Sequence, residues 1–135
     1  MKAQGHGGSL VLLSSKSGLE PSKANTAYNA TKAGELHMAR GWALELGRDG
    51  IRVNCILPGL IYGPMTAPRM DEAIRAKRRE AGALGTEGTG WDVAWAAVFL
   101  ASDESRWITG VALPVDAGLL VMSPVTNTRL AQQKF

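Results

Sequence analysis

The chain has 135 residues, of which 45% are hydrophobic and 20% charged, and its formal net charge at pH 7 is +3. This balance is typical of one soluble globular domain and excludes a disordered or fibrous chain. The positive charge is too small for a nucleic-acid-binding surface, and no apolar run is long enough to span a membrane. A single cysteine excludes an internal disulfide and favours a reducing, cytoplasmic setting.

A short unbroken apolar run at residues 10–13 predicts the first strand, of the kind that is buried in a parallel sheet. A long helix is expected from about residue 26 to residue 46. Its apolar stripe consists of Leu36, Ala39, Ala43 and Leu46. Residues 51–57 predict a second strand, which ends at Pro58-Gly59. This strand–helix–strand order predicts a right-handed parallel βαβ unit.

Residues 60–90 are less regular, because prolines and glycines interrupt the pattern. Residues 70–81 nevertheless predict a short, strongly basic helix. The segment follows the carboxyl end of the second strand, which favours either a mobile lid or a solvated connecting helix.

The remaining elements are an apolar helix at residues 91–101 and a third strand at residues 111–115. The fold class is therefore α/β with a parallel sheet. The tryptophans of this part are expected in the core or in a subunit contact: Trp91, Trp95 and Trp107. Residues 1–123 are interpreted as one structural unit, and residues 124–135 as a loose polar tail.

Three polar residues have the spacing of an acid–base site. Tyr28 and Lys32 are one helical turn apart, so both side chains project from the same face. Free tyrosine titrates near 10, so proton transfer near neutral pH requires the phenolate to be stabilised by roughly 4 kcal/mol, much of which a nearby ammonium can supply. Ser15, at the end of the first strand, can hold the substrate oxygen that gains or loses the proton. Taken singly, Ser15 is typical of a strand end and Tyr28 of packing.

Other chemically capable side chains have simpler interpretations. His6 and His37 have no partners at metal-ligand spacing, so no metal site is predicted. Cys55 lies in an apolar strand and is expected in the core. Asp116 is expected to cap or turn the chain.

The order of these motifs resembles the C-terminal half of the short-chain dehydrogenase/reductase family. It reads strand, Ser15-x-x-Gly18, Tyr28-x-x-x-Lys32, helix, strand and Pro58-Gly59. Further matching segments are Arg52-Val53-Asn54, Val98-Phe99-Leu100-Ala101-Ser102-Asp103, Ile108-Thr109-Gly110 and Val115-Asp116-Ala117-Gly118. The resemblance implies part of a Rossmann-like, doubly wound parallel sheet, with three C-terminal strands and their crossover helices.

The resemblance also implies an oxidoreductase that transfers hydride between a nicotinamide cofactor, NAD or NADP, and the carbonyl or secondary alcohol of a small molecule. Ser15 would orient the substrate oxygen. Tyr28 would transfer the proton and lie against the cofactor. Lys32 would lower the pKa of the tyrosine and hydrogen-bond the nicotinamide ribose. The loop after Pro58-Gly59 would touch the nicotinamide, with Ile61 backbone groups near its carboxamide.

Some features of the family pattern are changed or absent. Gly63 stands where the family often has a threonine, with Thr66 nearby, and Asp116-Ala117-Gly118 replaces Asp-Gly-Gly. The glycine-rich phosphate turn of the family's N-terminal βαβ half has no counterpart. We therefore expect a chain that begins internally, as a truncated reading frame or an excised fragment. Residues 10–13 would then form an unpaired sheet edge, which predicts marginal stability for the chain alone.

A second interpretation is a non-catalytic remnant that acts only as an assembly module. In many family members the helix after Tyr-x-x-x-Lys packs against its copy in another subunit, so the resemblance implies a homo-oligomer through residues 26–46. The small residues on this helix are compatible with such a contact: Ala27, Ala30, Ala33 and Gly34.

Overall fold

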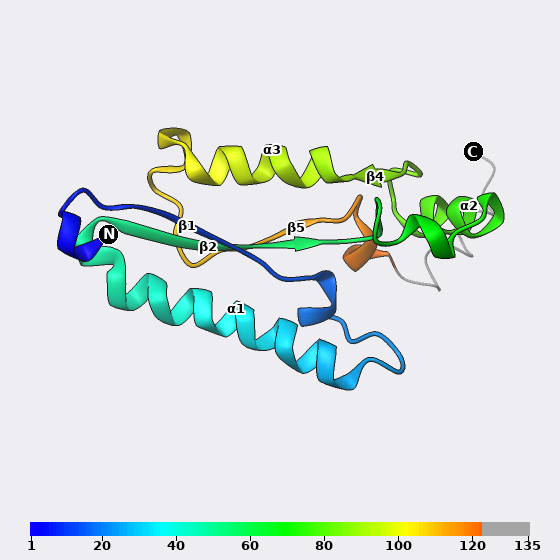
Figure 1. Cartoon of the computed structure of the whole chain (residues 1–135), viewed down its shortest axis with the longest axis horizontal. Coiled ribbons are helices and arrows are strands. Elements are labelled where there is room, and N and C mark those ends of the chain that lie inside the picture. The colour runs from blue at the N-terminus through cyan, green and yellow to red at the C-terminus, as the bar shows by residue number, and fades with distance from the viewer. Residues whose placement is uncertain (123–135) are drawn as a thin grey trace, which may run out of the picture.

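The computed structural model describes residues 1–122. Its helices and strands are β1 (Gly8–Leu13), α1 (Thr26–Leu46), β2 (Ile51–Pro58), β3 (Ile61–Tyr62), α2 (Glu72–Ala81), β4 (Gly88–Thr89), α3 (Gly90–Ala101) and β5 (Ala112–Val115). The main sheet lies between α1 on one face and α3 on the other, and α2 lies near the carboxyl ends of β2 and β5 (Figure 1). The expected tail at residues 124–135 lies outside the described residues.

The main sheet has the strand order β1-β2-β5, and all its pairs are parallel. Leu10 lies opposite Val53, and Cys55 lies opposite Ala112. The central strand β2 is buried over almost its whole length, which accounts for its nearly continuous apolar sequence. The predicted α/β class, the three strands and the long helix between the first two are confirmed.

The predicted stripe of α1 packs on β2 and forms the main core. The buried residues of this core, from α1 and β2 together, are Leu36, Ala39, Ala43, Ile51, Val53, Cys55 and Leu57, and Leu46 packs against them. Each large aliphatic side chain buried in this way contributes about 1.5–3 kcal/mol to folding. Cys55 is one of these residues, and burial raises the pKa of its thiol, so it is a core residue as expected.

Two segments that carry the family resemblance meet on the other side of β2. The fully buried Asn54 amide donates to the Ile108 carbonyl at 2.9 Å and accepts from the Val111 N–H at 3.1 Å. The Val53 N–H donates to the Thr109 hydroxyl at 3.0 Å, and the Gly110 N–H donates to the Val53 carbonyl at 2.7 Å. These bonds hold the turn before β5 against β2.

Residues 60–90 are more regular than their sequence suggests. The expected basic helix is present as α2, but β3 and β4 also pair in parallel, with Ile61 opposite Gly88. Arg75 joins α2 to β3 and to the residue before β4: its guanidinium lies 4.3 Å from the centre of the Tyr62 ring, and its Nε donates to Glu87 at 2.9 Å. This hydrogen bond lowers the pKa of Glu87 and raises that of Arg75.

The expectation that the tryptophans of the second half lie in the core is wrong. Trp91, Trp95 and Trp107 are 73%, 68% and 93% exposed. The helix α3 is apolar on all sides, so its sequence pattern does not indicate which face turns inward, and only Leu100 of this helix is buried. Subunit packing of these rings stays a prediction.

Within residues 1–122, no helix is long and apolar enough to cross a membrane.

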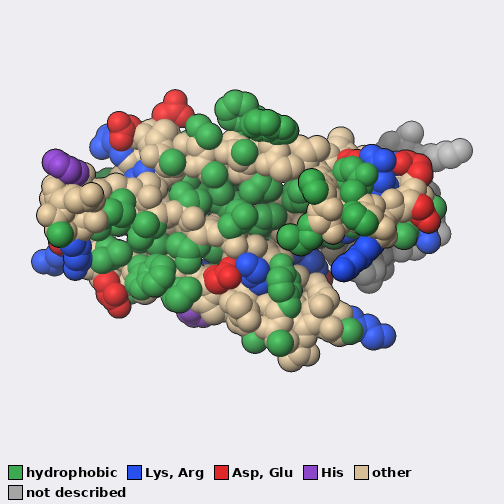
Figure 2. All heavy atoms as spheres, in the orientation of Figure 1, with side chains coloured by type: hydrophobic (Ala, Val, Ile, Leu, Met, Phe, Trp, Pro, Cys, Tyr) green, Lys and Arg blue, Asp and Glu red, His purple; other side chains and the backbone are tan. Residues whose placement is uncertain are grey.

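The strand β1 lies at the edge of the sheet, and no strand among the described residues pairs with its second side. Leu13 at its end is more than half exposed, and hydrophobic side chains form a band between α1 and α3 (Figure 2). Since such an edge can pair with another chain, we expect concentration-dependent association of the purified chain. Thermal unfolding followed by circular dichroism and light scattering tests this, and a cooperative, monomeric transition would contradict it.

Candidate active site

The end of β1 is joined closely to the first turns of α1. The Ser14 hydroxyl is buried and donates to the Lys32 carbonyl at 2.7 Å. A Cβ atom on Gly18 would stand only 2.8 Å from the same carbonyl oxygen, so the glycine of the Ser15-x-x-Gly18 motif is needed for this close approach. Ser15 itself caps the short turn at residues 16–18, because its side-chain oxygen accepts from the Ser17 N–H at 3.1 Å.

The loop before α1 is held by one asparagine. The Asn29 side chain accepts from the Ser22 N–H at 3.2 Å and donates to the Ser22 carbonyl at 2.9 Å. The Ser22 hydroxyl in turn lies 2.9 Å from the Ser17 hydroxyl. The helix begins at Thr26 as expected, although Asn25 at its N-cap makes no side-chain cap. Tyr28 is therefore presented by a fixed first turn.

Tyr28 and Lys32 lie on one face of α1, as their spacing predicts. The tyrosine is 47% exposed, and the lysine Nζ is 5.8 Å from the centre of its ring. The same ammonium donates to the Leu13 carbonyl at 3.1 Å and to the two carboxylate oxygens of Glu35 at 3.0 and 2.9 Å. This counter-charge was not predicted from the sequence, although a glutamate three residues after a lysine in a helix is the signal for it.

The end of β2 meets the end of β5 at Gly59. The Gly59 N–H donates to the Val115 carbonyl at 2.9 Å, and a Cβ atom on this glycine would stand 2.6 Å from that of Asp116. The Asp116 carboxylate accepts from the backbone N–H groups of Gly118 and Leu120, both at 2.9 Å, so its expected role in a turn is confirmed. Ala117 has a φ of 55°, a conformation that costs a residue other than glycine about 1 kcal/mol.

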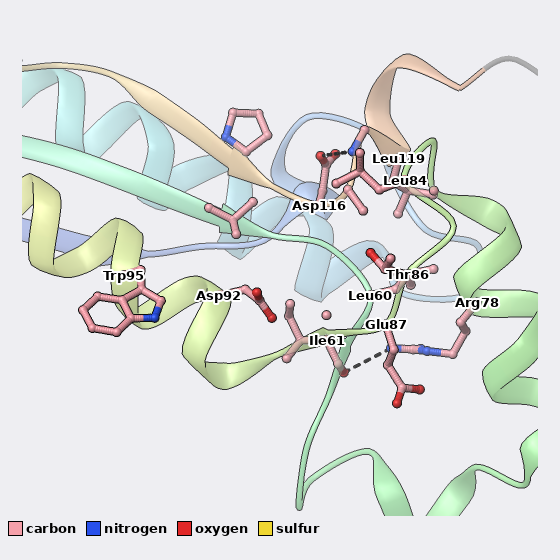
Figure 3. Close-up of a pocket in the computed structure, with 16 residues that line it drawn as sticks. Leu60, Ile61, Arg78, Leu84, Thr86, Glu87, Asp92, Trp95, Asp116 and Leu119 are labelled. Carbon is pink, nitrogen blue, oxygen red and sulfur yellow. Dashed lines mark hydrogen bonds between the residues drawn. The ribbon is translucent and has the colours of Figure 1, made fainter.

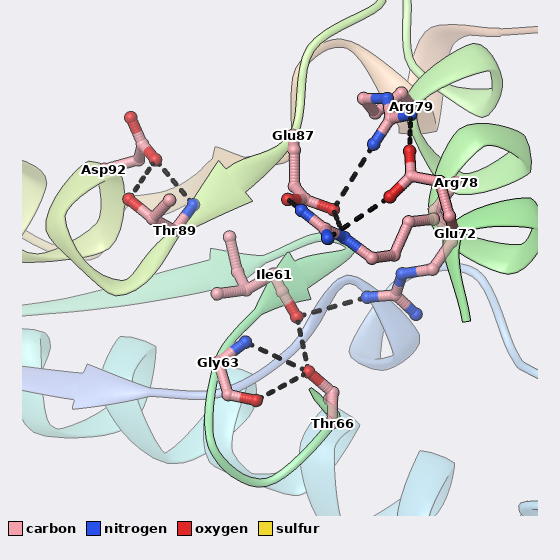
Figure 4. Close-up of polar contacts among 10 residues, drawn as sticks. Ile61, Gly63, Thr66, Glu72, Arg78, Arg79, Glu87, Thr89 and Asp92 are labelled. Carbon is pink, nitrogen blue, oxygen red and sulfur yellow. Dashed lines mark hydrogen bonds and ion pairs between the residues drawn. The ribbon is translucent and has the colours of Figure 1, made fainter. Parts of the chain in front are cut away.

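Thr66 closes the loop that follows β3 (Figure 4). Its hydroxyl accepts from the Gly63 N–H at 3.1 Å and lies 3.3 Å from the Ile61 carbonyl. The Thr66 hydroxyl thus bonds the backbone of Gly63, the position at which the family often has a threonine. The Ile61 carbonyl also accepts from Arg78 at 3.1 Å, and the Ile61 N–H donates to Gly59 at 3.0 Å. The Ile61 backbone groups proposed for the carboxamide are thus already hydrogen-bonded within the chain.

One open cleft of about 810 Å³ brings most of the predicted site residues together at the carboxyl edge of the sheet. Ser15, Tyr28, Pro58-Gly59 and Ile61 all line it. Lys32 does not line the cleft, and its Nζ lies 5.8 Å from the centre of the Tyr28 ring. The other lining residues are Ser14, Leu60, Tyr62, Gly63, Pro64, Met65, Thr66, Arg78, Gly90, Trp91 and Ala94. Ligands of open α/β sheets bind at this edge.

A second cavity, of about 510 Å³, lies beside the first and shares Arg78 with it (Figure 3). Its acidic side chains have internal partners. Asp92 accepts from the Thr89 N–H at 2.6 Å, which lowers the pKa of the carboxyl, Asp116 holds the turn after β5, and Glu87 pairs with Arg75. These groups are engaged within the fold, whereas the first cleft is lined by Ser15 and Tyr28 of the predicted site.

Comparisons with known proteins agree with this architecture. A family model described as enoyl-(acyl carrier protein) reductase matches residues 1–120. The L-rhamnose 1-dehydrogenase (NAD(P)(+)) of Sphingomonas sp. strain SKA58 is 41% identical over 122 residues, which are 90% of this chain and 48% of that protein. The 3-oxoacyl-[acyl-carrier-protein] reductase of Thermotoga maritima is 40% identical over 114 residues, 84% of this chain and 46% of that protein.

Solved structures of dehydrogenases and related proteins are also similar to this chain over about half of their length. Carveol dehydrogenase from Mycobacterium avium in complex with NAD superposes with a TM-score of 0.82 at 36% identity, over 90% of this chain and 49% of that chain. ElxO with NADP bound gives a TM-score of 0.82 at 28% identity, over 90% and 50%. The chain spans about half the length of the relatives that it matches. It belongs to the short-chain dehydrogenase/reductase family.

Proposed function

We propose that this chain carries the proton-transfer half of an NAD(P)-dependent dehydrogenase or reductase. The substrate is a small molecule with a carbonyl or a secondary alcohol. The observation that carries the proposal is the meeting of Ser15, Tyr28 and Pro58-Gly59 in one cleft of a chain that belongs to this family. The names of its relatives, which include a sugar dehydrogenase and a carveol dehydrogenase found with NAD, support this class of reaction.

In this proposal Ser15 binds the reacting oxygen and Tyr28 exchanges the proton with it. The Ser15 oxygen accepts from Ser17, and no acceptor for its own proton occurs among residues 1–122, which leaves that proton for a substrate oxygen. Lys32 supports the tyrosine with a positive charge beside its ring. Glu35 weakens this effect, because its carboxylate neutralises part of the charge.

The residues of the cleft fit one side of a nicotinamide cofactor, which when bound supplies or accepts the hydride. Tyr28 and Lys32 would contact its ribose, and Pro58-Gly59 would lie against the nicotinamide. The Ile61 side chain would contact the nicotinamide. The Ile61 carbonyl would bind the carboxamide only after the bond from Arg78 or Thr66 is broken. The remaining contacts with the cofactor, those to its phosphates among them, would come from the N-terminal βαβ half of the family's domain, which carries the glycine-rich turn.

The direct test is a titration of the purified chain with NADH and NADPH, followed by nicotinamide fluorescence. We expect weak but saturable binding, which becomes tighter when the other half of the domain is supplied in trans. If no saturable binding is found at millimolar cofactor under either condition, the non-catalytic assembly module is the better interpretation.

We also propose α1 as the contact with a second copy of the chain. Ala30, Gly34, Met38 and Trp42 follow one another at intervals of four residues, and all four are exposed. Small residues at one end allow close approach of another helix, while the larger side chains at the other end can bury apolar area.

A further inference from the structure

We propose that Arg78 makes this cleft a site for an anionic substrate, a short oxo or hydroxy acid whose carboxylate binds the guanidinium while its carbonyl or hydroxyl lies at Ser15 and Tyr28. The placement of the reacting oxygen rests on the proposed function. The carboxylate contact rests on the surroundings of Arg78 alone.

Among the described residues that line the cleft, only Arg78 carries a formal charge. The other described residues that line it are apolar side chains, glycines and neutral hydroxyl groups. The arginine comes from α2, whereas Ser15 and Tyr28 come from other elements, the end of β1 and the start of α1. A molecule that spans the cleft can therefore meet the hydroxyl groups at one end and a cation at the other.

The neighbouring arginines of α2 are in ion pairs, whereas Arg78 is in none within the part of the chain that the structure describes. Arg75 bonds with Glu87, and Arg79 donates to Glu72 at 2.6 Å (Figure 4). Among residues 1–122 Arg78 has no ion pair. Within the same residues its only hydrogen bond, to the Ile61 carbonyl at 3.1 Å, uses one of five N–H donors.

The position of Arg78 also favours an anionic ligand energetically. The side chain is half-buried, and this burial lowers the pKa of its guanidinium, an effect that Glu87 opposes only in part. A cation whose loss of water is offset only in part by a nearby carboxylate is stabilised further by an anion that reaches it. The planar fork of arginine matches a carboxylate in two parallel hydrogen bonds.

A phosphate group of the cofactor offers the same chemistry as a substrate carboxylate, so the experiment must separate the two. The probes are 4-oxopentanoate, its neutral analogue 4-oxopentanamide, and inorganic phosphate. Each is titrated into the ¹⁵N-labelled 135-residue chain, and the amide shifts of Gly59 and Gly90 beside the cleft are followed. We expect the oxo acid to bind at least about tenfold more tightly than its amide.

Two variants and one control locate the effect. Arg78→Gln should abolish the preference for the acid, and Arg78→Lys should keep part of it. Lys77→Gln, which removes the same charge from an exposed neighbouring position on α2, should leave the preference intact. If Arg78→Gln disturbs the fold, its spectrum will show this, and Arg78→Lys then decides the question, because it keeps the charge but not the fork.

Equal binding of acid and amide, or an unchanged preference in both Arg78 variants, would overturn the proposal. Binding of phosphate that depends on Arg78, without binding of the oxo acid, would assign the arginine to the cofactor and also overturn it. None of these readings requires hydride transfer. A failure here is therefore distinct from a failure of the proposed reaction, which shows in turnover and nicotinamide binding.

Discussion

The variant Tyr28→Phe is expected to lose roughly 10²–10⁴-fold in turnover, the range that one positioned acid or base contributes. The substitution keeps the ring beside Lys32 and removes only the hydroxyl that would exchange the proton. Turnover is measured by nicotinamide absorbance, with this chain fused to the half of the Sphingomonas relative that it does not match.

The matched control for this variant is Tyr62→Phe. Tyr62 is the second tyrosine of the chain, and its ring packs against Arg75 through a contact that phenylalanine keeps. We expect a loss of at most a few-fold from this change. Turnover retained in Tyr28→Phe would show that the proton donor is assigned wrongly, and equal losses in both variants would point to general damage to the cleft.

The largest effect on stability is expected for Asn54→Ala. The Asn54 side chain is fully buried, and it bonds the Ile108 carbonyl and the Val111 N–H. Its loss would leave the Val111 N–H without this acceptor and the Ile108 carbonyl with only the longer bond from Arg52 at 3.4 Å. We expect a cost of roughly 1–3 kcal/mol. If the chain alone has the marginal stability that we expect, a loss of this size would unfold a large fraction of it. Urea unfolding followed by circular dichroism measures it as a shift of the midpoint at constant slope.

Asn25→Ala serves as the control for this change. Asn25 is exposed, and its side chain makes only a long contact of 3.4 Å with the Lys23 carbonyl. Its replacement should change the free energy of unfolding by less than about 0.5 kcal/mol. If Asn54→Ala were equally mild, the turn before β5 would not depend on the buried amide.

The sequence predicted the strands and helices well wherever its periodicity had a single solution. The stripe of α1 and the apolar run of β2 each indicated one buried face, and both are buried as expected. On α3, where every face is apolar, the same reasoning put tryptophans in the core that are exposed. The two short strands β3 and β4 escaped prediction, because a parallel pair of two residues on each side has no periodic signal.

The sequence by itself determined the α/β class, the family resemblance and the pairing of Tyr28 with Lys32, because each of these depends on local spacing along the chain. Only the tertiary structure decided that Ser15, Tyr28 and Pro58-Gly59 share a cleft and that Glu35 bonds Lys32. It alone also decided that Arg78 lines the same cleft and has no carboxylate partner among residues 1–122. The reason is physical: a local pattern specifies which face of an element is buried, but which charges meet across a cleft depends on how separate elements pack.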